Sequence, residues 1–349
     1  MSAVDEALAA ATVDSRDRKI ARLERRVDEA ERIAKSCAIE MEREKQRADF
    51  ALAVSGPFDV EPIRPISAKG KVREAASFMT LSDTHFEERV RPETVNGLNK
   101  YDIAIAKDRL FEYARGIEWY HRLLTTGDVR YRIRQGVLGA LGDFITGFIH
   151  QEYEEENQLS PEDATLLAEE YVCDFIHHIR KRLDLERLVV MWNHGNHDRG
   201  TAKVQPSNMA RRSFSWIMAH HVRRQFQSDN RIEFKIADGI HLYHDVMGHK
   251  IRTTHGDTIR YKDGVGGLSI PANKAIEKWN HGIRADITVH GHLHTIGEDD
   301  PRVGNGSLIG YNPFAVYIKA KPEPAAQAVF VIDPDYGKSF FKRIVVQET

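Results

Sequence analysis

The sequence contains little cysteine, with only Cys37 and Cys173 among its 349 residues. Two cysteines are too few for a disulfide framework or for a zinc site built from cysteine ligands, and they indicate a reducing compartment. The first 14 residues also lack the basic start and the apolar run of a signal peptide. No stretch approaches the length and hydrophobicity of a transmembrane helix. We therefore expect a cytoplasmic protein that does not associate with membranes.

An excess of charge of either sign is missing as well. Lys and Arg number 50 and Asp and Glu 52, which gives a formal net charge of −2. This balance excludes a globally basic nucleic-acid-binding protein but is compatible with a local basic groove, because binding depends on where the charges lie. With 41% hydrophobic and 29% charged residues, the composition is typical of a globular protein with one large domain or two small ones.

Glycine and proline are absent from residues 15–50, where Arg, Glu, Lys and Ala predominate. That composition predicts a long, solvent-exposed helix. Its apolar residues alternate at spacings of three and four, which is the pattern of a coiled-coil seam. The seam residues are Ile20, Leu23, Val27, Ala30, Ala34, Cys37 and Met41. Two interpretations stay open: the helix joins copies of the chain into a homo-oligomer, or it is a charged helix that lies on its own domain or is partly frayed.

Prolines and glycines interrupt every periodic pattern at residues 55–71, which we interpret as a linker. The predicted organisation is therefore a charged helix at 1–54, the linker, and a folded domain at 72–349. In that domain the apolar runs SFMTLSD, GVLGALGD and RLVVMWNHGNHD alternate with helical stretches at 107–124 and 161–183, and later strands with fewer helices predict a second sheet. We expect an α/β or α+β layered fold with reactive residues at the carboxyl ends of strands.

Residues capable of binding metals stand at five successive strand ends. In chain order the fragments are LSDTHF, LGDFITG, HGNHDR, THGD and HGHLH. Each fragment is weak alone, because a single histidine at a strand end is usually a hydrogen-bonded core residue. Five in series are a much stronger signal. The residues concerned are Asp83, His85, Asp143, Asn196, His197, Asp198, His255, Asp257, His292 and His294.

This order of motifs, D-x-H, G-D, G-N-H-D, H-G-D and G-H-x-H, resembles the signature of the calcineurin-like metallophosphoesterase superfamily over about residues 78–346. The resemblance implies a four-layer β-sandwich flanked by helices, with two metal ions at the strand ends. It also implies a ligand set in which one ion is held by Asp83, His85 and His294, the other by Asn196, His255 and His292, and both by a bridging Asp143.

The chemistry of these ligands points to the same kind of site. Imidazole, carboxylate and amide oxygen together suit Mn²⁺, Fe or Zn²⁺ better than Ca²⁺ or Cu(I), and we expect two divalent ions, with Mn²⁺ favoured. Two such ions need a bridging anion to offset their repulsion, and a shared hydroxide is a nucleophile at neutral pH. The expected reaction is hydrolysis of a phosphoester by in-line attack of that hydroxide.

The leaving oxygen of such a reaction needs a proton. His197, inside G-N-H-D, is the candidate donor, and Asp198 is expected to hold its tautomer through a hydrogen bond to the far ring nitrogen. The alternative for His197 is a structural histidine. We expect Asp257 to orient the metal ligands rather than to bind metal.

Three further residues lie next to these motifs. Arg199, directly after G-N-H-D, is expected to meet the substrate phosphate. His194 is expected either to contact that phosphate or to give buried support. His290 is expected to support the site from within the strand that precedes G-H-x-H.

The motifs also bear on the substrate. GDFITG and GNHD depart from the protein Ser/Thr phosphatases of the superfamily, which carry Asp-Arg-Gly after G-D and glutamate in G-N-H-E. They look closer to phosphodiesterases and DNA repair exonucleases, and NGSLIGYNPFAVY resembles exonuclease-like phage-borne members. We expect a DNA nuclease; the alternatives are a phosphomonoesterase, a small-nucleotide phosphodiesterase, or a non-catalytic binding protein that retains the fold. The arginine-containing segments 130–134 and 211–224 are candidates for contact with DNA or for charged rims of core-facing elements.

Overall fold

The computed structural model describes residues 3–54, 72–126, 131–149, 156–260 and 267–347. The chain divides into two units, Met1–Ile66 and Ser67–Thr349. The predicted linker at 55–71 lies outside the described residues. None of the helices in the described part combines the length and the apolar character that a membrane span requires.

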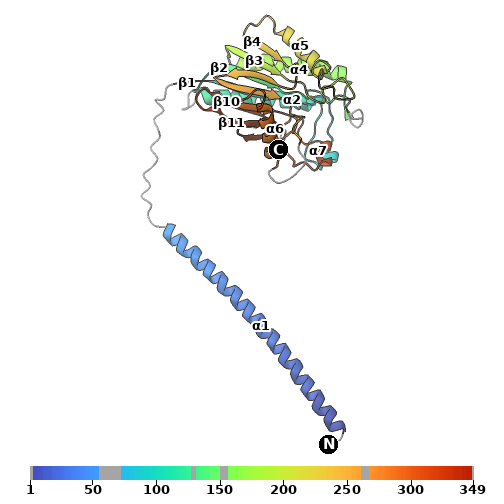
Figure 1. The fold of residues 1–349 in the computed structure, drawn as a ribbon, viewed down its shortest axis with the longest axis vertical. Helices are drawn as coiled ribbons and strands as arrows, with labels where there is room; N and C mark the ends of the chain where they lie inside the picture. Colours follow the sequence, from blue (N-terminus) through green and yellow to red (C-terminus); the bar gives the residue numbers. More distant parts are fainter. Residues whose placement is uncertain (1–2, 55–71, 127–130, 150–155, 261–266, 348–349) are drawn as a thin grey trace. The chain divides into compact units, whose positions relative to one another are not determined.

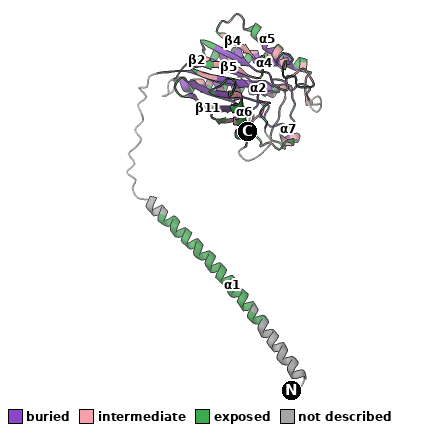
Figure 2. Ribbon diagram, in the orientation of Figure 1, coloured by how far each residue is buried: buried purple, intermediate pink, exposed green. Residues whose placement is uncertain are grey.

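The described part of the first unit is one helix, α1, which spans Ala3–Val54 (Figure 1). Its described side chains, from residue 18 to 49, are exposed in the single chain, apart from residue 21, whose side chain is not described (Figure 2). This exposure includes the apolar seam, where Ile20, Leu23 and Val27 are 52%, 50% and 56% exposed. The predicted helix is thus present, and its pairing with a second copy stays a prediction at this point.

The second unit is built on a six-stranded sheet with the order β11-β10-β1-β2-β3-β4. Four of its strands run parallel: β1 (Arg73–Leu81), β2 (Tyr131–Ala140), β3 (Arg187–Trp192) and β4 (Ile232–Ile236). The antiparallel strands β10 (Ala326–Asp333) and β11 (Gly337–Val345) complete it. Parallel neighbours need crossover connections, so helices α2 (Ile103–Thr126), α4 (Pro161–Arg182) and α5 (Phe214–Gln225) lie between them in the chain. The carboxyl ends of β1, β2 and β3 therefore meet at one edge.

A second sheet of five strands has the order β5-β6-β7-β9-β8. Its strands are β5 (Leu242–Val246), β6 (His249–Thr254), β7 (Ile287–His290), β8 (Gly297–Asp299) and β9 (Arg302–Gly304). Strands β6, β7 and β9 run parallel. Helix α6 (Ser269–Asn280), helix α7 (Pro313–Tyr317) and the 3₁₀ turn η1 (Pro92–Val95) complete the described elements.

Both faces of the six-stranded sheet are buried. Because side chains alternate along a strand, Phe78 of β1 points toward the second sheet, with which it shares a core cluster, and it stacks on Phe330 of the neighbouring strand β10 with ring centroids 4.9 Å apart. Its neighbour Met79 lies in a different core cluster, together with Ile117 of α2 and Phe175 of α4. The sheet is thus enclosed between helices on one side and the second sheet on the other.

The expectation of a mixed α/β chain with two sheets is confirmed. The predicted helices at 107–124 and 161–183 correspond to α2 and α4. Strands β8 and β9 were not predicted, because three residues are too few to show a periodic pattern. The four-layer architecture implied by the superfamily stays a prediction.

Candidate metal centre

The motif residues come together at the carboxyl ends of strands from both sheets. Asp83 follows β1, Asp143 follows β2, and His255 follows β6. Two groups of potential ligands form there, and within each group the ligand atoms lie within 4.8 Å of one another. The first group is Asp83, His85 and His294, and the second is Asp143, His255 and His292. Ligands about 2.0–2.2 Å from one ion lie within roughly 4.4 Å of each other, so each group is close to the size of a coordination shell.

Backbone strain is concentrated in these two groups. Ten non-glycine residues in the described part of the chain have a positive φ, and five of them are group members. That conformation costs a residue with a Cβ about 1 kcal/mol or more, and it persists where the surroundings impose it. The strained members are Asp83, His85, Asp143, His292 and His294, with φ between 45° and 68°. The sharp bends after the strands aim these side chains at common points.

The glycines of the motifs let the backbone approach the carboxylates. A Cβ on Gly195 would lie 2.0 Å from Oδ1 of Asp143, and one on Gly291 would lie 2.5 Å from Oδ2 of Asp83. Gly142, with φ +95°, would place a Cβ 2.4 Å from the backbone N of Gly195. Any side chain at these positions would displace a carboxylate or a loop, which explains why the residues before both Asp143 and Asn196 are glycine.

The first group is fixed by contacts from several elements. The backbone N–H of His292 donates to Oδ1 and Oδ2 of Asp83 at 3.0 and 3.1 Å, and the Ser82 hydroxyl donates to Oδ2. His294 places Nε2 at 3.3 Å from Oδ1 of Asp83. Because His292 belongs to the second group, its hydrogen bond to Asp83 also ties the two groups together.

His85 is held from its far side. Its Nδ1 lies 3.1 Å from Oγ1 of Thr146, and that hydroxyl donates to Oε2 of Glu88 at 3.2 Å. The hydroxyl has one proton, so it accepts from Nδ1–H of His85 while donating to Glu88. The remaining ring nitrogen, Nε2, is then unprotonated and has a lone pair available for a metal ion. It is buried and has no hydrogen-bond partner among the residues that the structure describes, as is expected of a metal ligand.

The second group has the same character. Nδ1 of His255 lies 2.8 Å from the carbonyl oxygen of Leu141, which can only accept, so Nδ1 carries the proton. Nε2 lies 3.0 Å from Oδ2 of Asp143 and 3.0 Å from Oδ1 of Asn196. A neutral His255 would thus present a lone pair to two oxygen acceptors. Only a proton or a metal cation at this point makes the arrangement favourable.

The pKa values of the histidines in the two groups also indicate that positive charge is favoured there. Burial lowers the pKa of His255, but the carboxylates of Asp143, Asp83 and Asp257 together outweigh it and raise that pKa to about 10. Burial likewise opposes, and Asp83 produces, the raised pKa of His294. Burial, followed by a neighbouring histidine, lowers the pKa of His85 and that of His292, the latter to about 4. Each group therefore contains one carboxylate, one imidazole that is neutral, and one imidazole whose position favours positive charge. This set of ligands fits a divalent metal ion.

His197 and Asp198 are placed differently from each other. Nδ1 of His197 lies 3.0 Å from the carbonyl oxygen of Thr146, and its ring packs edge-on against His85 with centroids 4.9 Å apart. The carboxylate of Asp198 instead accepts backbone N–H groups of Asp143 (2.9 Å), Phe144 (3.0 Å) and Gly195 (2.9 Å). The expectation that Asp198 holds the His197 tautomer is therefore wrong, because the Thr146 carbonyl takes that place. Asp198 clamps the two loops that carry Asp143 and Asn196.

The other predicted residues surround the second group. His194 is buried, and no described residue makes a hydrogen bond to its Nδ1. Burial, followed by His255, lowers the pKa of His194 to about 4. The Asp257 carboxylate acts to raise the pKa of His194, His255 and His292, which places it beside them. Its orienting role stays a prediction.

Arg199 turns back on its own loop. Its Nε donates to the carbonyl oxygen of Thr201 at 2.8 Å, and its Nη1 lies 3.5 Å from that of Asn196. The guanidinium thus braces the loop that carries Asn196. His290, by contrast, has the structural position expected for it: it is fully buried between the Gly291 carbonyl, 2.9 Å from Nδ1, and Arg302, whose Nη1 lies 3.5 Å from Nε2.

Several residues of the site were not predicted from the sequence. Thr146 and Glu88 orient His85, and Asn312 donates to Oε1 of Glu88 at 3.0 Å. Glu87 accepts the backbone N–H groups of Thr146 and Gly147 at 2.7 and 3.0 Å. The sequence offered one hint of them, since Glu87 and Glu88 stand directly beside the D-x-H motif.

The two predicted arginine segments lie in different places: the first is far from this site, and the second begins beside Asp198, where the backbone N–H of Phe214 donates to the Asp198 carbonyl oxygen at 2.8 Å. Arg132 and Arg134 pair with Glu74 and Glu186 at 3.0 and 2.5 Å. They stand at the start of β2, whereas Asp143 follows its end, and at about 3.3 Å per residue the separation is roughly 30 Å. Arg130 lies outside the described residues. In the second segment, Arg211 pairs with Asp238 at 3.1 Å.

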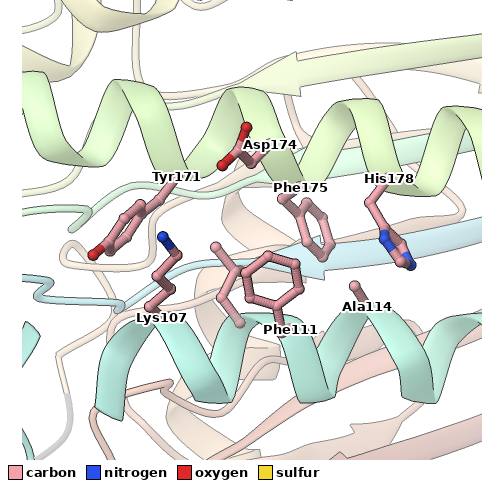
Figure 3. A pocket seen from close by; sticks show the side chains of 8 residues that line it. Lys107, Phe111, Ala114, Tyr171, Asp174, Phe175 and His178 are labelled. Carbon is pink, nitrogen blue, oxygen red and sulfur yellow. The ribbon is translucent and has the colours of Figure 1, made fainter. Parts of the chain in front are cut away.

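A small cavity lies away from the site, between α2 and α4 (Figure 3). Its lining includes Phe111 and Ala114 of α2 and Tyr171 and Phe175 of α4. Its volume is about 10 Å³, the space of roughly one water molecule, so it offers no room for a substrate.

Comparison with known proteins gives only distant likenesses. No protein-family model and no curated protein matches the chain. Among solved structures, a hypothetical protein from Pyrococcus horikoshii OT3 is similar at 13% identity and a TM-score of 0.37, over 78% of this chain and 89% of that one. A zinc complex of Vps29 from Entamoeba histolytica is similar at 11% identity and 0.27, over 78% and 99%. Vps29 from Chaetomium thermophilum is similar at 12% identity and 0.30, over 74% and 85%. Likenesses of this size do not assign a family.

Proposed function

We propose that this chain is a metal-dependent phosphoesterase that hydrolyses phosphodiester bonds, with DNA as its substrate class. The observation that carries the proposal is that the ligand atoms of both groups face a common point: Nε2 of His255 faces two oxygen acceptors, and Nε2 of His85 is buried with no hydrogen-bond partner in the described part of the chain. The motif resemblance to the metallophosphoesterase superfamily supports it independently of these contacts.

Two divalent cations fit this donor set, with Mn²⁺ as our first choice and Fe or Zn²⁺ as alternatives. Asp83, His85 and His294 would hold one, and His255, His292 and Asn196 the other, with Asp143 shared between them. When bound, such ions lower the pKa of a water molecule toward about 7 and neutralise charge on phosphate oxygens. A shared position for Asp143 is supported by its electrostatic coupling to both His255 and His85.

The chain's own residues hold these donors and move the proton. Asp198 fixes the loops of Asp143 and Asn196 against each other, so their relative position does not depend on the substrate. His197 keeps its proton on Nδ1 through the Thr146 carbonyl, which leaves Nε2 as the atom that carries a second proton. Burial lowers the pKa of His197, so the protonated ring gives up that proton readily to the far more basic leaving alkoxide.

The surface next to the first group supports a nucleic-acid substrate. Asn312 caps α7 and also contacts Glu88 beside His85, so α7 begins near the site. The residues that follow expose aromatic and basic side chains together, namely Phe314, Tyr317, Lys319 and Lys321. Exposed aromatic rings interleaved with lysines are suited to stacking bases and pairing with phosphates.

A substrate panel tests the proposal. Purified protein with Mn²⁺ is incubated with end-labelled DNA, bis-p-nitrophenyl phosphate, p-nitrophenyl phosphate and a cyclic nucleotide, with Asp143→Asn as the matched inactive variant. We expect the wild type, and not the variant, to cleave DNA and the diester. Cleavage of the monoester or the cyclic nucleotide alone would replace DNA by one of the two alternative substrate classes. Absence of turnover on every substrate would leave the third alternative, a binding protein.

A further inference from the structure

We propose that α1 pairs with α1 of a second copy of the chain as a parallel, in-register, two-stranded coiled coil. The proposal concerns the first unit alone and does not depend on the proposed catalytic function. It commits to one partner, an identical chain, and to one alignment of the two helices.

The first argument is the apolar stripe on an otherwise charged helix. With Ile20 at position a of a heptad, Leu23 takes d, Val27 a, Cys37 d and Met41 a. In the single chain these residues are exposed, like the rest of the described side chains of α1 in Figure 2. Met41 is 74% exposed. The stripe covers about three heptads, the length at which such helices begin to associate. β-Branched residues at a with leucine at d favour two strands over three or four, and Ile20, Val27 and Leu23 follow that rule.

The second argument is the charge beside the stripe, which fixes direction and register. In a parallel pair, each g residue faces the e residue five positions later on the partner. Lys19 then faces Glu24 of the partner subunit, Arg26 faces Glu31 of the partner subunit, and Glu40 faces Lys45 of the partner subunit. All three contacts join opposite charges, and each occurs twice in the dimer. The one remaining contact of this kind within the stripe joins the uncharged Ile33 and Ala38 of the partner subunit.

An antiparallel pair that overlays the same stripe is less favourable. In that arrangement e residues face e and g residues face g. Glu31 would meet Glu31 of the partner subunit, and Lys19 would meet Arg47 of the partner subunit. Like charges at these positions are destabilising. Arg26 with Glu40 of the partner subunit and Asp17 with Lys45 of the partner subunit would instead join opposite charges. Favourable and unfavourable contacts therefore largely offset each other in this arrangement, whereas every charged contact of the parallel pair is favourable. The charge pattern therefore selects the parallel alignment.

Cys37 gives the alignment a chemical readout. It lies at a d position and is exposed in the single chain, so only a parallel, in-register pair brings it beside Cys37 of the partner subunit. An oxidant such as diamide would take two electrons and two protons from the two thiols and leave a disulfide between the chains. Burial raises the pKa of Cys173 to about 12, so the other thiol does not compete.

The test uses the full chain in sedimentation equilibrium and in non-reducing electrophoresis after diamide treatment. We expect a particle of twice the 39.8 kDa chain mass and a covalent dimer that Cys37→Ser abolishes. Glu24→Lys creates two like-charge contacts and should weaken association roughly tenfold. Lys19→Glu combined with Glu24→Lys should restore association. Glu29→Lys, at an outward-facing c position, is the control and should leave association unchanged. A monomer at 100 µM, a trimer or tetramer, absence of the disulfide, or equal effects of Glu24→Lys and Glu29→Lys would each overturn the proposal.

Discussion

Replacement of Gly195 by alanine tests how tightly the two metal-bearing loops depend on each other. The added Cβ would lie 2.0 Å from Oδ1 of Asp143 and 2.4 Å from its backbone N, so one loop must move by about 1 Å to reach ordinary contact. Movement is opposed by Asp198, which accepts N–H groups from both Gly195 and Asp143 at 2.9 Å. Overpacking costs about 1–3 kcal/mol and loss of one charge-assisted hydrogen bond about 1.5–3 kcal/mol. We therefore expect the free energy of unfolding to fall by roughly 3–5 kcal/mol.

Urea unfolding and phosphodiesterase assays measure the two consequences. The unfolding midpoint should fall by about 1 M or more, and a 1 Å displacement of Asp143 should lower activity about 100-fold. Gly239→Ala is the matched control, because its Cβ would meet nothing within 4 Å and should change stability by less than about 0.5 kcal/mol. Equal midpoints and equal activities for the two variants would refute the close approach of these loops.

Three further changes have distinct signatures. Burial raises the pKa of Glu87 to about 8, so the stability that the protonated Glu87 contributes is complete below its unfolded pKa of about 4.5 and is lost as the pH rises through 8. Glu87→Gln should therefore be more stable than the wild type by about 1 kcal/mol or more at pH 9, but not at pH 5. If urea unfolding gave the same difference between the two proteins at both pH values, this reasoning would be wrong. His197→Ala should slow DNA cleavage about 100-fold or more while sparing bis-p-nitrophenyl phosphate, whose leaving group needs no proton; equal losses on both substrates would exclude a donor role. Mn²⁺ at about 100 times its dissociation constant should stabilise the wild type by about 2.7 kcal/mol, seen as a rise in the thermal unfolding temperature that Asp143→Asn reduces; equal rises in both proteins would argue against ligation by Asp143.

Most of the candidate metal ligands can be identified from the sequence alone. Ligand-type residues at strand ends are predictable because buried strands are recognisable by their apolar runs, and the carboxyl ends of parallel neighbours must meet at one edge. Asp83 and Asp143 illustrate this, since their loops are joined by a hydrogen bond from the backbone N of Asp83 to the carbonyl of Gly142 at 3.0 Å.

Contacts between distant segments were beyond such patterns. Because Asp198 is next to His197 in the sequence, we expected a hydrogen bond between them. In the fold, the Asp198 carboxylate instead accepts the backbone N–H of Asp143, which lies 55 positions away in the chain. Asn312 reaches Glu88 across 224 positions, and no local motif announces it. Arg132 and Arg134 were considered for substrate contact because of their alternate spacing, whereas they lie at the start of β2, at the opposite end of the strand from the site. The cytoplasmic location and the DNA substrate stay predictions.

Metal stoichiometry tests the central claim most directly. The full chain, stripped with chelator and dialysed against MnCl₂, is measured by elemental mass spectrometry together with Asp83→Asn combined with His294→Ala. Two Mn²⁺ per wild-type chain and one per variant chain are the predicted values. A wild-type chain that retains no manganese above the dialysis background, or that retains the same amount as the variant, would contradict a dimetal centre at these strand ends.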